Sequence, residues 1–254
     1  MMHYMLEHKS ELVKLLRMVE INVTEAELDD DHIHFGEKSE ITGEKGEKPL
    51  VPSCDYLCKI IEELPNNKYA QAKIRAGNAE SVTTIERRKL LDNPVARAEA
   101  ILYIKEHYGS LLEDYKGIFF LEGSSKPDVF IETANQVIVI EGKWTERHPT
   151  ESTTYVENRN QMVRHIHDAL NYVRLGKFWK KVVGFYILAD TFANEWNAQI
   201  SPEGFASTLS SQFGIEAEHD EIASAYKGYI TWEQIVESFP GVADSSRGWK
   251  KLAE

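Results

Sequence analysis

The chain has 254 residues, enough for one large or two small domains, and 42% apolar with 28% charged residues is ordinary for a globular protein. It holds no run of eighteen apolar residues, and its first residues lack the apolar stretch of a signal peptide, so we expect a cytoplasmic protein with no membrane partner. The formal net charge of −12 argues against a protein that coats nucleic acid.

Two basic segments interrupt this acidic chain. Residues 64–97 hold seven basic and three acidic residues, and residues 159–181 hold six basic residues and one acidic residue. A local basic stripe is enough for contact with phosphates, and scattered solvated side chains are the alternative. We expect Arg159 and Arg164 to flank a phosphate-binding site, together with one or more of Lys73, Arg75, Arg87 and Arg88.

Residues 1–93 are expected to form a mostly helical N-terminal extension. Apolar residues recur at helical spacing within 6–23, and further helices are predicted from Ser53 to about Leu64 and over 68–79. Residues 32–35 are a candidate short strand, and the charged, glycine-bearing segment around 39–49 is a loop.

Residues 94–254 are expected to form an α/β core with C-terminal additions. A helix is predicted from Pro94 to about His107, capped by Asn93 or Asp92, and its Glu99 shares a face with apolar neighbours. Strands follow at 117–121, 129–131 and 137–143, then a helix over 155–175 that ends at Gly176 and a buried strand over 181–189. The order is therefore helix, three antiparallel strands, helix, strand. The additions are helices at 190–199 and 205–213, a short strand at 229–232 and a helix capped by Thr231.

Reactive side chains coincide with strand periodicity in one place only. Because side chains two apart share a strand face, Glu141 and Lys143 are neighbours at the end of the strand. Asp128 opens the preceding antiparallel strand, which predicts that it lies close to both. Two carboxylates and an ammonium suit a hard cation such as Mg²⁺, which polarises a phosphoryl oxygen and activates water. An ordinary surface ion pair is the alternative at this stage.

This pattern, Pro127-Asp128 followed by Glu141-Gly142-Lys143, resembles the PD-(D/E)XK nuclease superfamily, whose restriction-endonuclease-like core has the order of elements predicted for 94–189. The resemblance implies that Asp128 and Glu141 hold Mg²⁺, or Mn²⁺ in its place, with the Gly142 carbonyl a further ligand, and that Lys143 is the third catalytic residue. Members of that family often carry a Glu on the first core helix that reaches the metal, and Glu99 is the candidate here. The alternative is a residue at the edge of the apolar face, paired with Arg97 or lying near Tyr103.

Some members of that family carry Gln at the start of the second core helix, followed four residues later by Tyr. Here Gln161 is followed by His165, a partial match, so both are candidates for contact with a phosphate or a metal-bound water. A solvated helix face is the alternative for this pair.

The function expected from the resemblance is Mg²⁺-dependent hydrolysis of phosphodiester bonds in DNA, and the sequence leaves a homodimer open. The alternative is a catalytically silent module of the same fold that binds nucleic acid or protein. An Asp128 on the sheet face opposite to Glu141 would end the nuclease interpretation.

Overall fold

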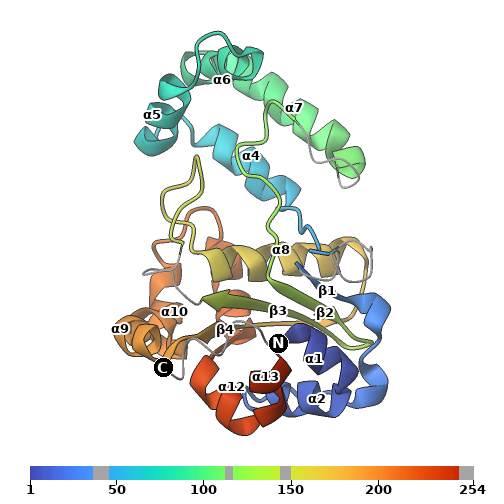
Figure 1. Cartoon of the computed structure of the whole chain (residues 1–254). Helices are drawn as coiled ribbons and strands as arrows, with labels where there is room; N and C mark the ends of the chain where they lie inside the picture. Colours follow the sequence, from blue (N-terminus) through green and yellow to red (C-terminus); the bar gives the residue numbers. More distant parts are fainter. Residues whose placement is uncertain (37–45, 112–116, 144–149, 246–254) are drawn as a thin grey trace.

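The computed structural model describes residues 1–36, 46–111, 117–143 and 150–245. The chain is an α/β protein with one mixed sheet of five strands, in the order β1-β2-β3-β4-β5 (Figure 1). The pairs β1–β2 and β2–β3 are antiparallel, whereas β3–β4 and β4–β5 are parallel. The strands are β1 (Ile33–Phe35), β2 (Val129–Glu132), β3 (Gln136–Lys143), β4 (Lys181–Leu188) and β5 (Tyr226–Thr231).

The predicted hairpin is confirmed. Val129 of β2 lies opposite Ile140 of β3, and the connecting turn is closed by the Thr133 amide, which donates to the Gln136 carbonyl at 2.8 Å. The expected alternation along β3 is also present, since Val137 and Val139 enter one core and Ile138 and Ile140 enter the other. A strand that is buried on both faces in this way reads as a continuous β-branched run.

Helices cover both faces of the sheet (Figure 1). On one face α8 lies against β3 and β4, with the group α4 to α7 beyond it. The helices on this side are α4 (Cys54–Glu62), α5 (Lys68–Ala76), α6 (Val82–Asp92), α7 (Pro94–Leu111), α8 (Gln161–Leu175), α9 (Asp190–Ile200), α10 (Pro202–Leu209) and α11 (His219–Ala225). The other face is covered by α1 (Met2–Glu7), α2 (Lys9–Arg17), α12 (Trp232–Ser238) and α13 (Pro240–Ser245).

Residues from both sides of the expected boundary at 93 build the same sheet and the same cores. The segment 33–35 is the outer strand of the antiparallel part, and Leu12, Leu15 and Leu16 of α2 pack in the core beneath β2, β3 and β4. On the opposite face, residues of α4 and α7 share one core with α8.

The strand expected over 117–121 is wrong. Two of its carbonyls, those of Ile118 and Phe120, accept hydrogen bonds from the guanidinium of Arg87 at 2.7 and 3.0 Å, and the Phe120 amide turns back to the Gly117 carbonyl. Backbone groups satisfied by a side chain need no neighbouring strand. The third antiparallel strand is β1, which comes from far earlier in the chain.

Helix boundaries differ modestly from the expectations. Asn93 caps α7 through the amides of Val95 and Ala96 as predicted, and α7 then continues through Gly109 to Leu111. The helix expected to begin at 155 begins at Gln161, because the Asn160 side chain accepts from the amides of Met162 and Val163. Residues 82–92 form α6, which the sequence reading missed.

Helix α8 lies unusually close to β4, because Gly184 has no side chain. A Cβ at this position would lie 2.8 Å from Cγ1 of Ile166 and 3.0 Å from the Met162 sulfur. This close approach sets the distance between the start of α8 and the end of β3, where the motif residues lie.

Candidate active site at the end of strand β3

Glu141 and Lys143 form a buried ion pair on the β3 face that α8 covers. Lys143 Nζ lies 2.9 Å from Glu141 Oε1, and the two side chains are only 4% and 2% exposed. The predicted strand-face pairing is therefore confirmed, whereas an ordinary surface ion pair is excluded. Burial of two charges is costly, so the pair needs further hydrogen bonds to balance it.

Helix α8 supplies these hydrogen bonds from its first turns. Gln161 Nε2 donates to Glu141 Oε1 at 2.5 Å, and His165 Nε2 lies 3.1 Å from Oε2. Burial raises the pKa of Glu141, but the hydrogen bond and charge of His165 and those of Lys143 outweigh it, and the pKa lies below its ordinary value. Glu141 is thus held ionised between a strand and the following helix.

His165, a candidate for contact with a phosphate or a metal-bound water, contacts Glu141 in this structure. The residue is buried and directed at Glu141, one helical turn after Gln161, so the two share a face as their spacing predicts. Within the described residues, Gln161 Oε1 and His165 Nδ1 are buried and have no hydrogen-bond partner.

Asp128 lies beside this pair but not with it. Continuing the register of Val129 and Ile140 places Asp128 opposite Glu141, and its Oδ2 accepts from the Gly142 amide at 2.8 Å. That oxygen is also 3.5 Å from where a Cβ of Gly142 would be, on the face turned away from α8. A cavity of about 310 Å³ on that face is lined by Asp128, Gly142 and Trp232. The three motif head groups therefore do not surround one point in this structure. The prediction that Asp128 lies close to Glu141 and Lys143 holds for its backbone position and is wrong for its carboxylate, because the hydrogen bond to the Gly142 amide turns that group to the other face.

Glu99 is not brought to the site. It is exposed on α7, on the same face as the exposed Val95 and Leu102, while Ala100, Ile104 and Tyr108 form the buried face. The helix packs against α4 and α6. The apolar neighbours that suggested a buried carboxylate are themselves exposed, which explains the error.

The donor atoms present suit a hard divalent cation. Carboxylate and amide oxygens are the preferred ligands of Mg²⁺, and Glu141, Asp128 and the unpaired Gln161 Oε1 provide them within two adjacent strands and one helix. Across the residues that the structure describes, no group of three or more His, Cys, Asp or Glu side chains is arranged to hold a metal ion. The donor atoms are therefore of the kind that Mg²⁺ prefers. In this structure the side chains around Glu141 form hydrogen bonds and an ion pair with one another.

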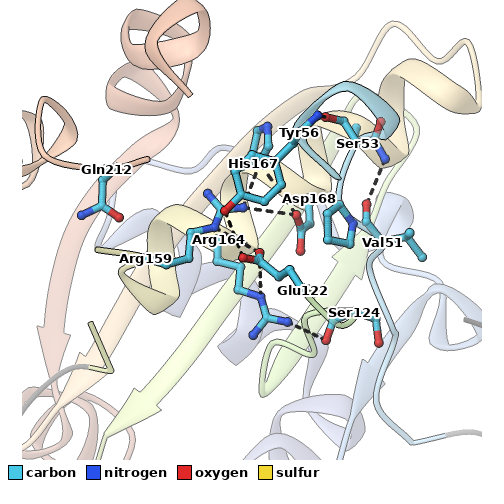
Figure 2. A network of polar contacts seen from close by, with 12 residues as sticks. Val51, Ser53, Tyr56, Glu122, Ser124, Arg159, Arg164, His167, Asp168 and Gln212 are labelled. Atoms are coloured by element: carbon cyan, nitrogen blue, oxygen red, sulfur yellow. Dashed lines mark hydrogen bonds and ion pairs between the residues drawn. The ribbon is translucent and has the colours of Figure 1, made fainter. Parts of the chain in front are cut away.

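Arg159 is the clearest correction among the predicted nucleic-acid contacts. It is completely buried, its Nε lies 3.1 Å from Glu122 Oε1, and its guanidinium lies over the Tyr56 ring at 4.3 Å (Figure 2). Its Nη2 donates to His167 Nδ1 at 3.0 Å and lies 3.7 Å from Asp168 Oδ1. A guanidinium enclosed in this way cannot contact DNA.

Several other predicted phosphate contacts are also occupied inside the protein. Arg164 donates to the carbonyls of Gly123 and Ser124 and lies 3.3 Å from Glu122 (Figure 2). Arg87 holds the 118–120 carbonyls, and Arg88 donates to the carbonyls of Arg75 and Gly77. These arginines connect loops to helices and do not form the expected stripe beside Glu141. Lys73 and Arg75, the other two candidates, are exposed on α5.

The buried network around Arg159 was not found from the sequence. Its acidic members are Glu122 and Asp168, and burial raises the pKa of Asp168 to about 7 against the opposing effect of Arg159. Burial and the Arg159 charge also keep the pKa of His167 well below its ordinary value, so its Nδ1 accepts. The one available signal was the spacing of Arg164 and Asp168, four apart on a helix whose other face is apolar.

Comparison with known proteins returns no match for this chain, whether against protein-family models, curated proteins or solved structures. Among the described residues, no helix is long and apolar enough to cross a membrane.

Proposed function

We propose that this chain is a Mg²⁺-dependent nuclease of the PD-(D/E)XK type, with a restriction-endonuclease-like core, that hydrolyses phosphodiester bonds in DNA. The observation that supports it best is the cluster at the end of β3, where Glu141 and Lys143 share one face and meet Gln161 and His165 of the next helix. A buried, ionised carboxylate with a lysine at this separation is expensive to maintain as a purely structural feature, which favours a functional role.

The metal would be held by Glu141, and Asp128 would join it only after its side chain turned from the Gly142 face toward α8. When bound, the metal would supply a polarised phosphoryl oxygen and a water of lowered pKa. The chain's own residues have separate tasks. Lys143 balances the charge of Glu141 and offers an ammonium to charge that develops on the phosphate. Gln161 and His165 orient Glu141 from α8, and Gln161 Oε1 is an additional acceptor for a water.

The test compares Glu141→Gln and Lys143→Ala with the wild type on single-stranded, duplex and branched DNA, in Mg²⁺ or Mn²⁺. Each change should reduce the cleavage rate by about 10²-fold or more, because charge stabilisation and proton transfer contribute that much. Binding of Ca²⁺ should weaken with Glu141→Gln and persist with Lys143→Ala.

The matched control is Glu132→Gln. Glu132 also pairs with a lysine, Lys180, at 2.5 Å, but it lies near the other end of β3. This control should cleave like the wild type. Equal cleavage by the wild type and both site variants would remove the catalytic assignment.

A second candidate is a catalytically silent module that binds nucleic acid or protein. It is favoured by one observation: Asp128 lies toward the Gly142 face, while both oxygens of Glu141 are engaged by nitrogen donors. This candidate predicts no Mg²⁺ binding and no cleavage by the wild type, with DNA or protein binding unaffected by Glu141→Gln.

A further inference from the structure

The turn that joins α8 to β4 displays aromatic and basic side chains together. It reads Leu175-Gly-Lys-Phe-Trp-Lys-Lys181, and Trp179 is fully exposed, while Phe178 is 42% exposed. Large aromatic side chains gathered on a surface mark a binding site more often than a chance arrangement. We name Leu175, Lys177, Phe178, Trp179 and Lys181 the α8–β4 surface.

The cations of this surface are available to a partner. Lys177 and Lys181 are exposed and form no ion pair with any other residue that the structure describes, whereas Lys180 is paired with Glu132 and Arg174 with Glu218 and Glu221. Residues 174–181 contain four basic and no acidic residues, in a chain of net charge −12. The positive charge of the 159–181 segment is therefore presented here rather than beside Glu141.

A cavity of about 730 Å³ adjoins the α8–β4 surface, and its wall includes one carboxylate, that of Glu47. Leu175, Gly176 and Phe178 form part of its wall, and Lys48 Nζ lies 5.2 Å from the centre of the Tyr172 ring, also in the wall. The volume is in the range of sites that enclose a small organic group. Planar rings and an ammonium thus line a hollow directly beside the exposed aromatic residues.

We propose that the α8–β4 surface binds single-stranded nucleic acid, with bases stacked on Trp179 and Phe178 and phosphates held by Lys177 and Lys181. A single strand of nucleic acid presents a planar base and an anionic phosphate at each nucleotide. The aromatic rings of the α8–β4 surface can stack on the bases, and its lysines can bind the phosphates. A protein partner would be expected to need a larger apolar area than two aromatic side chains and a leucine.

The position of this surface deepens the proposed function and rests on it for the identity of the substrate. Lys181 pairs with Gln136, five residues before Glu141 along β3, which is about 17 Å. That backbone separation is comparable to the length of roughly five stacked nucleotides at about 3.4 Å each, so the surface and the buried Glu141 lie within the span of one short single strand. The surface would thus hold a single strand away from the site of cleavage.

The experiment measures binding of a fluorescein-labelled oligothymidylate of roughly 20 nucleotides by anisotropy in EDTA, where metal-dependent cleavage cannot occur. Trp179→Ala should raise Kd at least about 5-fold, and Trp179→Phe should retain most of the affinity because a ring remains. The double change Lys177→Ala with Lys181→Ala should lower the slope of log Kd against log salt by about 1.4. The matched control, Lys68→Ala with Lys105→Ala, removes two exposed lysines of α5 and α7 and should leave the slope unchanged.

Further arms separate this inference from the nuclease proposal. Binding that depends on Trp179 without any cleavage by the wild type supports the surface and rejects only the nuclease. Cleavage with Trp179→Ala binding like the wild type rejects the surface and retains the nuclease. Trp179-dependent binding to vesicles of phosphatidylserine and phosphatidylcholine, with no binding of the oligonucleotide, identifies a membrane surface and overturns the inference. Because these side chains are exposed, thermal unfolding should be unchanged in each variant.

Discussion

Asp168 shows what full burial does to a single carboxyl group. Burial raises the pKa of Asp168 to about 7, and it outweighs Arg159, which lies 3.7 Å from Oδ1, and the Ser125 hydroxyl, both of which lower that pKa. The charged groups that face it are Arg159, Arg164 and Glu122, with neutral His167 and Tyr56 beside them. Asp168 in the folded protein therefore keeps a proton at pH values where the same carboxyl group of the unfolded chain has lost it.

This residue makes the stability of the protein fall as pH rises. Between about pH 4 and pH 7 the folded state holds a proton on Asp168 and the unfolded state does not. The contribution of Asp168 to the free energy of unfolding is therefore complete below the pKa of the unfolded chain, and it is lost as the pH rises through the pKa of the folded protein. Asp168→Asn should flatten this slope and raise the free energy of unfolding at pH 8 by more than about 1 kcal/mol. Urea unfolding at several pH values measures it.

Exposed Asp92 provides the control for this prediction. Asp92→Asn should leave the slope as it is in the wild type. A wild-type stability that is constant from pH 5 to pH 8, or a variant with the same slope, would contradict the assignment.

The same buried residues explain why the sequence misplaced its arginines. Residue type and charge identify Arg159 as a cation but do not tell whether it faces solvent or a carboxylate, because the partner, Glu122, lies 37 positions away in the chain. Glu141 and Lys143 were placed correctly because their relation is local, two positions apart on one strand. Asp128 shows the limit of that approach, since register fixes its backbone and not its side-chain direction.

At the scale of elements, α8 connects the two polar clusters. Its first turns hold Glu141 through Gln161 and His165, and its middle carries His167 and Asp168 of the Arg159 network. The seat of this helix on β4 depends on Gly184, where a Cβ would meet Ile166 at 2.8 Å. A rigid helix displaced at Gly184 is displaced at both clusters.

Gly184→Ala should therefore lower the free energy of unfolding by about 1–3 kcal/mol, as overpacking of a core does, and should also reduce any cleavage. The control is Gly109→Ala in α7, where nothing lies within 4 Å of the added Cβ and the change should stabilise by up to about 1 kcal/mol. Thermal and urea unfolding measure both variants. A Gly184→Ala protein as stable as the wild type would show that α8 is not held at this distance.

Elements were predictable where their signal is local. The runs at 129–131, 137–140 and 181–188 form strands as expected, since several β-branched and apolar residues in a row favour a buried strand. The segment 117–121 is also mostly apolar but does not form a strand, because Arg87 of α6 donates hydrogen bonds to two of its carbonyls. The position next to β2 in the sheet is occupied by β1, which is only three residues long and so shows little of the periodicity that predicts a strand.

At the scale of the whole molecule, residues 1–35 are part of the sheet's foundation. Leu12, Leu15 and Leu16 are fully buried beneath Ile138, Ile140 and Phe185 of the central strands. Removal of this segment would expose an entire apolar sheet face to water, at about 25 cal/mol per Å².

We therefore expect residues 94–254 alone to be insoluble or to lack a cooperative unfolding transition. A matched control is the full chain with Leu102→Ala, an exposed position that should have no effect. Soluble yield, circular dichroism and urea unfolding measure the result. A stable, cooperative fragment would instead support the boundary at 93 as the edge of an independent core.

The shortness of β1 also bears on how copies of this protein meet one another. An edge strand presents unpaired backbone groups on which another chain can add a strand and begin aggregation. Here β1 is three residues long and is separated by His32 alone from Asp29, Asp30 and Asp31, so two copies that approach through it bring six carboxylates together. Growth of the sheet through β1 is discouraged by charge and by length, and any homodimer is expected to form through another surface, of which the outer strand β5 is one.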